Sequence, residues 1–240
     1  MEGVLFAIVA AAFTVEAALG FGASLVMVTL GALLLDIRSL LVAVVPLNVT
    51  LSLWLVVRGR RHVDTRLLFR AVLPYMALGL PLGMWALRAL DASLMKRTFG
   101  VFVTLLALSA LANRGQRGPA ARSAVTDRLL LFAGGVVHGA FATGGPMAVY
   151  VVGQNFADKA AFRATLSSLW LVLNSLLVIS FVVDGRLDTA SLVTTAKLLG
   201  ALAVGLVVGE VLHRRVPEHT FRTLVWVVLG LGGAMLVVRG

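Results

Sequence analysis

Two short glycine-rich segments hold the residues of this chain that are best suited to binding chemistry. They are Gly20-Phe21-Gly22-Ala23-Ser24 and Thr143-Gly144-Gly145-Pro146. Glycine lets backbone N–H groups approach a ligand closely, and Ser24 and Thr143 add hydroxyl donors. N–H groups at the start of a helix attract anions. The candidate substrate-binding residues here are Gly20, Gly22, Ser24, Thr143, Gly144, Gly145 and Pro146. The alternative is that both segments are tight turns between helices, with no ligand.

Four polar residues near these segments are further candidates. Glu16 lies one turn before the first segment, and His138 has nearly the same position before the second. Ionisable groups inside a membrane usually face a cavity or a partner, so both are candidates for coupling to a proton or another ion. Glu16 alternatively sits at the outer water interface, and His138 is alternatively a neutral packing residue. Asn48 and Asn174 either bind a polar ligand or join helices.

The composition removes several other kinds of site. The chain has no Cys, and its four His are scattered, so we expect no metal site. We expect no cofactor, and we find no phosphate-binding Gly-rich loop ending in Lys and Ser or Thr. An enzyme would need a nucleophile with its base, or a metal cluster, whereas Glu16 and His138 are isolated. The net charge of +10 sits mostly in short loops, which favours a role in membrane topology over nucleic-acid binding.

Long apolar stretches must position these residues. The chain is 60% hydrophobic and has a mean hydropathy of +0.99, too apolar for a water-soluble domain. Stretches of about 17 to 25 apolar residues, the length that crosses a bilayer, recur throughout. We predict an all-α integral membrane protein in which each half begins with a broken, re-entrant helical hairpin. The first repeat (1–112) has its hairpin at about 4–35 and spans at 40–57, 67–90 and 94–112. After a basic linker (113–128), the second repeat (129–240) has its hairpin at 129–156 and spans at 162–183, 192–212 and 221–238.

The two halves match residue by residue. Asp64 and Asp188 both precede the third element of their half, and Gly22 falls opposite Gly145. Gly79 and Gly83 match Gly205 and Gly209, a Gly-xxx-Gly pair in each half, for which we expect close helix packing. The pattern indicates an internal duplication.

The distribution of Lys and Arg predicts the topology. If each hairpin returns to the side from which it came, one side collects the basic loop 58–66, the linker 113–128 and most of the remaining Lys and Arg. Cytoplasmic loops carry this excess. Both termini are therefore expected outside, and the two repeats are expected to be inverted. Charge does not distinguish re-entrant hairpins from complete crossings.

The order of these motifs resembles a known family. Gly20-Phe21-Gly22-Ala23-Ser24, the Gly-x-x-x-Thr-Gly-Gly-Pro run at 139–146 and Arg163-Ala164-Thr165 look like the TauE/SafE sulfite exporters, also called the toluene-sulfonate uptake family. The resemblance covers essentially the whole chain and differs at Ala23, where members often carry a third Gly. It implies a multi-span bacterial permease for sulfite, thiosulfate, sulfonates or other small organic anions.

Together these observations predict a secondary transporter of a small anion in the bacterial inner membrane, with the site between the two hairpin tips. We expect the lipid bilayer, the substrate and a proton or another coupling ion as partners, and no nucleic acid. The substrate, the direction of transport and the oligomeric state stay open. The alternatives are an integral-membrane enzyme acting on a lipid or peptide, and a membrane subunit whose basic loops dock a cytosolic partner.

Overall fold

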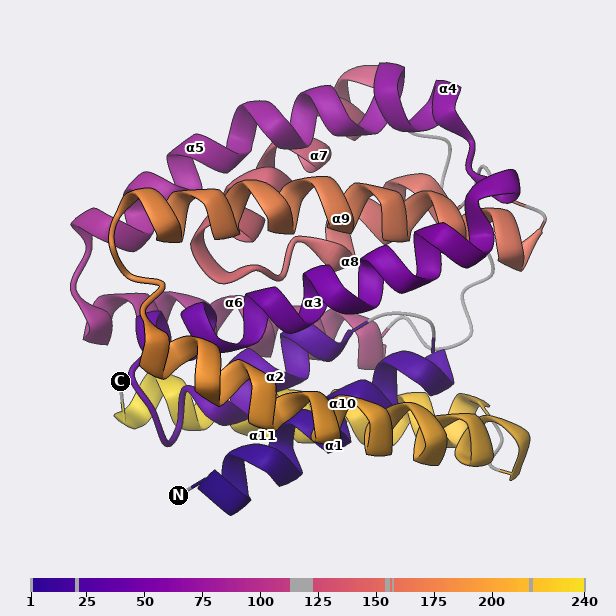
Figure 1. The fold of residues 1–240 in the computed structure, drawn as a ribbon. Coiled ribbons are helices and arrows are strands. Elements are labelled where there is room, and N and C mark those ends of the chain that lie inside the picture. Colours follow the sequence, from indigo (N-terminus) through magenta and orange to yellow (C-terminus); the bar gives the residue numbers. More distant parts are fainter. Residues whose placement is uncertain are drawn as a thin grey trace. The chain divides into compact units, whose positions relative to one another are not determined.

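The computed structural model describes residues 2–19, 22–112, 123–153, 156, 158–215 and 218–239, and every regular element in them is helical (Figure 1). Six helical segments are long and apolar enough to cross a membrane: Ile37–His62, Thr65–Ala89, Ala92–Ala112, Ala124–Phe141, Ala160–Val183 and Thr189–Leu212. A helix satisfies its own backbone hydrogen bonds, which is required in lipid. The expected class, an all-α protein with several membrane spans, is confirmed.

The helices follow one another with short connections. In chain order they are α1 (Glu2–Leu19), α2 (Ala23–Gly31), α3 (Ile37–Gly59), η1 (Arg60–His62), α4 (Thr65–Leu67), η2 (Leu68–Val72), α5 (Leu73–Ala89), α6 (Ala92–Ala112), α7 (Ala124–Phe141), α8 (Gly145–Val152), α9 (Lys159–Val183), α10 (Thr189–Arg215) and α11 (Glu218–Arg239). The element η1 is a 3-10 turn and η2 is a π-helical segment that runs directly into α5.

The chain forms two compact units, each containing segments of both sequence halves. Unit 1 comprises Met1–Val44, Leu90–Gln116 and Thr189–Gly240, and unit 2 comprises Val45–Ala89 and Arg117–Asp188. The hairpin α1–α2 therefore lies in unit 1 with α6, α10 and α11, while the hairpin α7–α8 lies in unit 2 with α5 and α9. The units do not follow the order of the predicted repeats.

Glycines bring α5 and α7 together in unit 2 (Figure 1). A Cβ on Gly79 would lie 2.2 Å from the Phe132 carbonyl oxygen, and one on Gly83 would lie 2.0 Å from that of Val136. From the other side, a Cβ on Gly135 would lie 2.1 Å from the Met76 carbonyl oxygen. The contacts advance in the same direction along both helices, so α5 and α7 are a parallel pair whose backbones touch.

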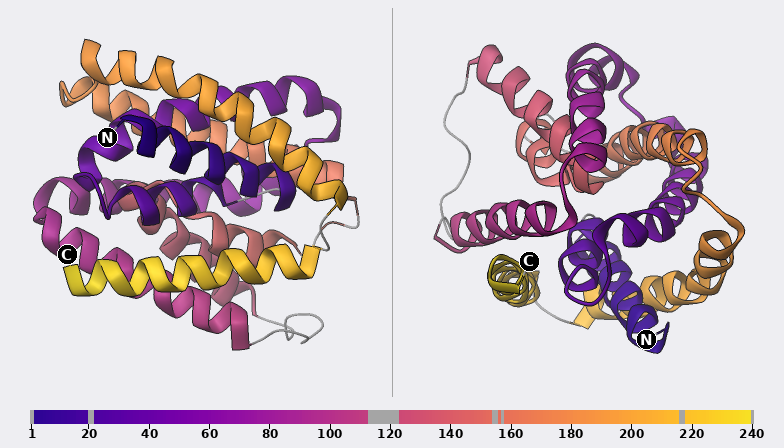
Figure 2. Two further views of the ribbon diagram at one scale, coloured as in Figure 1. Left: turned by 90° about the horizontal axis from the view of Figure 1, so that it is seen from below. Right: turned by 90° about the vertical axis from the view of Figure 1, so that its left-hand side faces the viewer.

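Unit 1 contains an equivalent pair, α10 with α1, and a third one, α6 with α11 (Figure 2). Cβ atoms on Gly205 and Gly209 would lie 2.5 Å and 2.6 Å from the carbonyl oxygens of Ala10 and Thr14. This pair is again parallel. Both predicted Gly-xxx-Gly pairs are thus confirmed as sites of close helix packing. The α6–α11 contact runs antiparallel, with a Cβ on Gly100 placed 2.6 Å from the Gly233 carbonyl oxygen.

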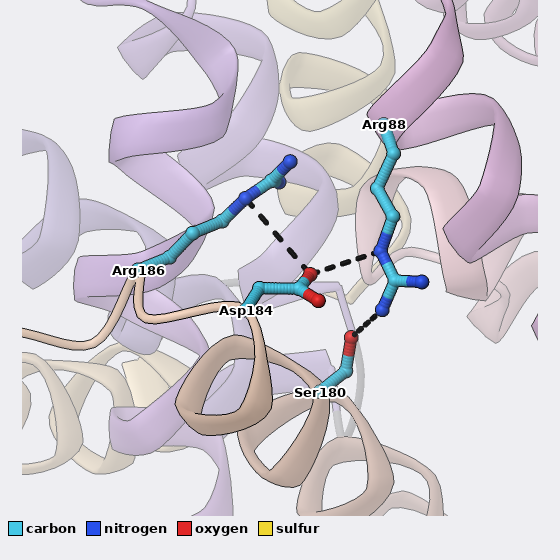
Figure 3. Close-up of polar contacts among 4 residues, drawn as sticks. All are labelled: Arg88, Ser180, Asp184 and Arg186. Atoms are coloured by element: carbon cyan, nitrogen blue, oxygen red, sulfur yellow. Dashed lines mark hydrogen bonds and ion pairs between the residues drawn. The ribbon is translucent and has the colours of Figure 1, made fainter.

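A polar cluster joins the ends of α5 and α9 in unit 2. The Arg88 Nε donates to Asp184 Oδ2 at 2.9 Å, and its Nη2 donates to Ser180 Oγ at 2.8 Å (Figure 3). The Arg186 Nε lies 4.0 Å from the same carboxylate oxygen. These groups are partly exposed, so each pair contributes little to stability by itself, and the cluster joins the end of α9 to α5.

The second hairpin differs in its bounds from the sequence prediction. Helix α7 begins at Ala124 rather than at 129, because Ser123 caps it by accepting a hydrogen bond from the Thr126 N–H at 3.2 Å. The last residues of the predicted linker are therefore helical. Helix α8 has only 8 residues. At 1.5 Å per residue it is about 12 Å long, too short to cross a bilayer core of about 30 Å.

Candidate functional site

The second helix break is a sharp backbone turn. Helix α7 ends at Phe141, and Ala142 has the left-handed conformation with φ 55°, while its N–H donates to the His138 carbonyl at 2.7 Å. An alanine pays about 1 to 2 kcal/mol for that conformation. Helix α8 then starts at Gly145 with Pro146 in its first turn, where the missing N–H costs nothing. Strained backbone of this kind is common at functional sites.

The two glycines of the break have different surroundings. A Cβ on Gly144 would lie 2.3 Å from the Gly134 carbonyl oxygen and 2.8 Å from His138 Cβ, so only glycine fits. A Cβ on Gly145 would have ordinary contact, 3.8 Å from Trp170 Cζ2. Packing therefore fixes Gly144 against α7, whereas space remains beside the first residue of α8.

His138 lies directly behind this turn. Its side chain is buried, and its ring stacks on the Trp170 indole with centroids 5.5 Å apart and planes 14° apart. The Gly144 N–H donates to His138 Nδ1 over a long distance of 3.4 Å. Because Nδ1 is the acceptor, a neutral imidazole carries its proton on Nε2, which makes Nε2 a donor.

Three buried polar atoms without a hydrogen-bond partner gather around the break. They are His138 Nε2, Thr143 Oγ1 and Asn174 Oδ1, and no other such atom is found in the described parts of the chain. The three residues are 2%, 3% and 2% exposed. Asn174 lies close enough to the imidazole to interact with it, but its Oδ1 is not in hydrogen-bond geometry with any described group. Buried polar groups are normally paired, so this cluster beside a helix N-terminus makes the second break the candidate ligand site.

The first break has a comparable contact. Gly22 has φ 109°, and α2 begins with the next residue, Ala23, whose N–H donates to Glu16 Oε2 at 3.1 Å. Ser24 is half-buried in the first turn of α2. The positive end of α2 therefore faces a carboxylate of the protein itself. Gly20, which we also predicted for this site, lies outside the described residues.

The predicted residues fall into separate groups. His138, Thr143, Gly144, Gly145, Pro146 and Asn174 come together in unit 2 at the second break. Glu16, Gly22 and Ser24 come together in unit 1. Asn48 is buried in the part of α3 that belongs to unit 2 and has interactions of its own. Its predicted role in binding the substrate stays a prediction.

Sequence reasoning missed three residues of the second break. Trp170 stands one helical turn before Asn174 and so shares its helix face, a signal that was available in the sequence. Gly144 packs against the backbone of Gly134. The position of Gly134, one turn before His138 on an apolar helix, was a weaker signal. Ala142 carries no signal, because alanine does not favour a positive φ.

A helical protein with several membrane spans, short interrupted helices and buried unpaired donors beside a helix start belongs to the class of membrane transport proteins. The profile of the family described as "Sulfite exporter TauE/SafE" matches residues 4–236. The chain therefore belongs to the TauE/SafE family, whose members are transporters and not enzymes. The predicted resemblance is confirmed, and the membrane-enzyme alternative is excluded.

A relative with a similar sequence supports the same class. The "Probable inner membrane transporter protein TsaS" of Comamonas testosteroni is 29% identical over 169 residues, which cover 69% of this chain and 70% of the relative. No solved structure matches the chain.

Proposed function

We propose that this protein is a secondary transporter of the bacterial inner membrane that moves a small sulfur oxyanion. The substrate is sulfite, thiosulfate or an organosulfonate. The observation that carries this proposal is the set of three buried, unpaired polar atoms beside the start of α8. The substrate class follows the name of the family, and the membrane follows the name of the relative from Comamonas testosteroni.

The second break offers groups that match an oxyanion. The first N–H groups of a helix have no partner inside it, and they carry partial positive charge. In α8 these include the N–H groups of Gly145 and Met147, since Pro146 has none. The Thr143 hydroxyl and the Nε2–H of a neutral His138 add two side-chain donors. The unpaired atom of Asn174 is the acceptor Oδ1, so Asn174 is not counted among these donors.

The break lies at a suitable depth for a transport site. Gly145 is next to Trp170, and Asn174 is one turn further along the same helix. Both belong to the middle turns of α9, which contains the candidate span Ala160–Val183. Broken helices near the middle of the bilayer are where secondary transporters bind their substrates.

The helix pairs agree with the proposed topology. With both termini outside and returning hairpins, α7 and α5 both run outward, and α1 and α10 both run inward. The glycine contacts make each of these pairs parallel and the α6–α11 pair antiparallel, as that topology requires. This agreement supports two inverted repeats, in which the third span of one repeat packs on the hairpin of the other.

Glu16 and His138 are the proposed coupling residues. Each accepts a hydrogen bond from the N–H at the start of the second arm of its own hairpin. A proton added to either group weakens or removes that acceptor, so protonation and anion binding at the same helix end are linked. The three unpaired atoms are closed to solvent, so the substrate reaches them only after a change of conformation.

The proposal is tested by flux into proteoliposomes. Labelled sulfite, thiosulfate, taurine and sulfoacetate are offered with and without a pH gradient, and empty liposomes serve as the control. We expect saturable flux of at least one of these anions. If none of them moves, the proposed substrate class is wrong.

A further inference from the structure

A surface groove lies at the beginning of the third span of the first sequence half. It is shallow and open to solvent, and it is lined by Thr65, Arg66, Phe69 and Arg70. These residues belong to α4 and η2, the first turns of the candidate span Thr65–Ala89. The groove lies in unit 2 but involves none of the residues of the second helix break.

The groove presents two exposed guanidinium groups. Arg66 and Arg70 are four residues apart, a spacing that places both on one side of a helix. Neither makes an ion pair or a hydrogen bond within the described part of the chain. Guanidinium groups bind phosphate through paired N–H donors, and the hydroxyl of Thr65 adds another donor. The charge of the groove therefore fits a phosphate group.

Phe69 gives the groove an apolar surface next to these charges. Its side chain is 56% exposed. Further along the same span, Leu78, Leu82 and Trp85 are also exposed, with spacings that follow one face of the helix. Such a face suits contact with lipid chains. The groove thus places an exposed aromatic side chain beside its two guanidinium groups, at the start of a span with lipid-facing residues.

The length of the span places the groove at the membrane surface. The span has 25 residues, which at 1.5 Å each gives about 37 Å, longer than a hydrocarbon core of about 30 Å. The first turns therefore reach the level of the lipid headgroups. The excess of Lys and Arg assigns this end to the cytoplasmic side, where anionic lipids attract basic residues.

Hydrogen bonds hold the start of the groove in place. The Asp64 N–H donates to the Thr165 hydroxyl of α9 at 2.9 Å, and the Asp64 carboxylate accepts from the Leu67 N–H at 2.9 Å. Asp64 is thereby engaged as the N-cap of α4. Arg66 and Arg70, which make no ion pair within the described residues, therefore extend from a helix start that is fixed before a ligand binds.

We propose that this groove binds the phosphate headgroup of an anionic phospholipid. Arg66 and Arg70 hold the phosphate, Thr65 donates to one of its oxygens, and Phe69 contacts the glycerol and the start of the acyl chains. This site is separate from the proposed transport site and does not depend on the substrate.

The test measures lipid retained by the purified full-length protein. Phosphatidylglycerol and phosphatidylcholine compete for the protein in detergent, and native mass spectrometry counts the bound molecules of each. We expect the protein to prefer phosphatidylglycerol, and we expect R66Q/R70Q to weaken this binding on the order of 30-fold, from about fivefold per basic residue. The matched control is R60Q/R61Q, which removes the same charge from the same basic loop but not from the groove.

Three results would overturn the proposal. They are an equal loss in R60Q/R61Q, no preference of the wild type for phosphatidylglycerol, and displacement of the lipid by millimolar glycerol phosphate, which would mark the groove as a site for a soluble phosphate. If R66Q/R70Q does not fold, the single variant R70Q takes its place: we expect it to weaken phosphatidylglycerol binding about fivefold, and unchanged binding would overturn the proposal.

Discussion

The imidazole of His138 accepts a hydrogen bond from the Gly144 N–H, so the last turn of α7 is joined to the start of α8 across the second helix break. The first break has the same kind of contact, from the Ala23 N–H to the Glu16 carboxylate. In both hairpins a titratable side chain of the first arm accepts a hydrogen bond from a backbone N–H at the start of the second arm. This relationship links the charge of the side chain to the ability of the helix end to bind an anion.

Gly144 and Gly145 are predicted to respond differently to the same substitution. Gly144→Ala forces a methyl group against the Gly134 carbonyl, so we expect loss of transport and a decrease in unfolding free energy of about 1 to 3 kcal/mol. Gly145→Ala places its methyl group at ordinary van der Waals distance from Trp170, 3.8 Å from Cζ2, and is expected to fold normally. Thermal unfolding and flux in proteoliposomes measure both effects. Equal stability of the two variants would show that the packing of Gly144 is not required.

Gly22 and Gly185 form a second matched pair, because both have a positive φ, of 109° and 66°. Substitution by Ala strains the backbone at either position, and we expect each variant to lose about 1 kcal/mol of stability. Only Gly22→Ala is expected to lower transport, because Gly22 forms the first helix break. Gly185 follows the end of α9 and belongs to neither break. A similar decrease in flux in both variants would mean that the effect comes from stability alone.

Glu16→Gln keeps an acceptor for the Ala23 N–H but removes the titratable charge. We predict that this variant still folds and transports, while the stimulation of flux by a pH gradient decreases several-fold. The measurement is flux at a series of external pH values at constant internal pH. A pH dependence identical to that of the wild type would count against Glu16 as a coupling residue.

Asp158 makes α9 sensitive to acid. The N–H groups of Ala160 and of Ala161, each 3.1 Å from the carboxylate, lower the pKa of Asp158 below its ordinary value of 3.8. Since the folded-state pKa is the lower one, this stabilisation is present above pH 4 and is lost as the pH falls below the ordinary value towards the folded one. Asp158→Asn keeps an acceptor but does not titrate, so its melting temperature should fall less between pH 5 and pH 3. Parallel curves for the two proteins would contradict this.

Much of the fold is predictable from the sequence because few physical rules decide it. Apolar length predicts the spans, and the Gly and Pro residues predict the break between α7 and α8 where the structure has it. The start of α7 was predicted too late, because the cap of Ser123 was not recognised within a polar, Arg-rich stretch.

The composition of the site was harder to predict than its position. Gly144 is irreplaceable because Gly134 faces it, and no pattern within either helix shows that contact. Trp170 stacks on His138 only because α9 packs against α7 at that level. The division into two compact units likewise depends on which helices pack together, which glycine pairs indicate without naming the partner helix.

The most direct test of the anion site is flux of the transported sulfur oxyanion through a Thr143→Val variant. Valine has nearly the same shape as threonine and removes only the buried, unpaired hydroxyl. Thr29→Val is the control, since the equally buried Thr29 hydroxyl donates to the Leu25 carbonyl of its own helix at 2.7 Å. We predict that Thr143→Val lowers flux roughly 10-fold or more, the value of one hydrogen bond to a charged group, while Thr29→Val transports normally. Wild-type flux and wild-type substrate affinity in Thr143→Val would contradict an anion site at the second helix break.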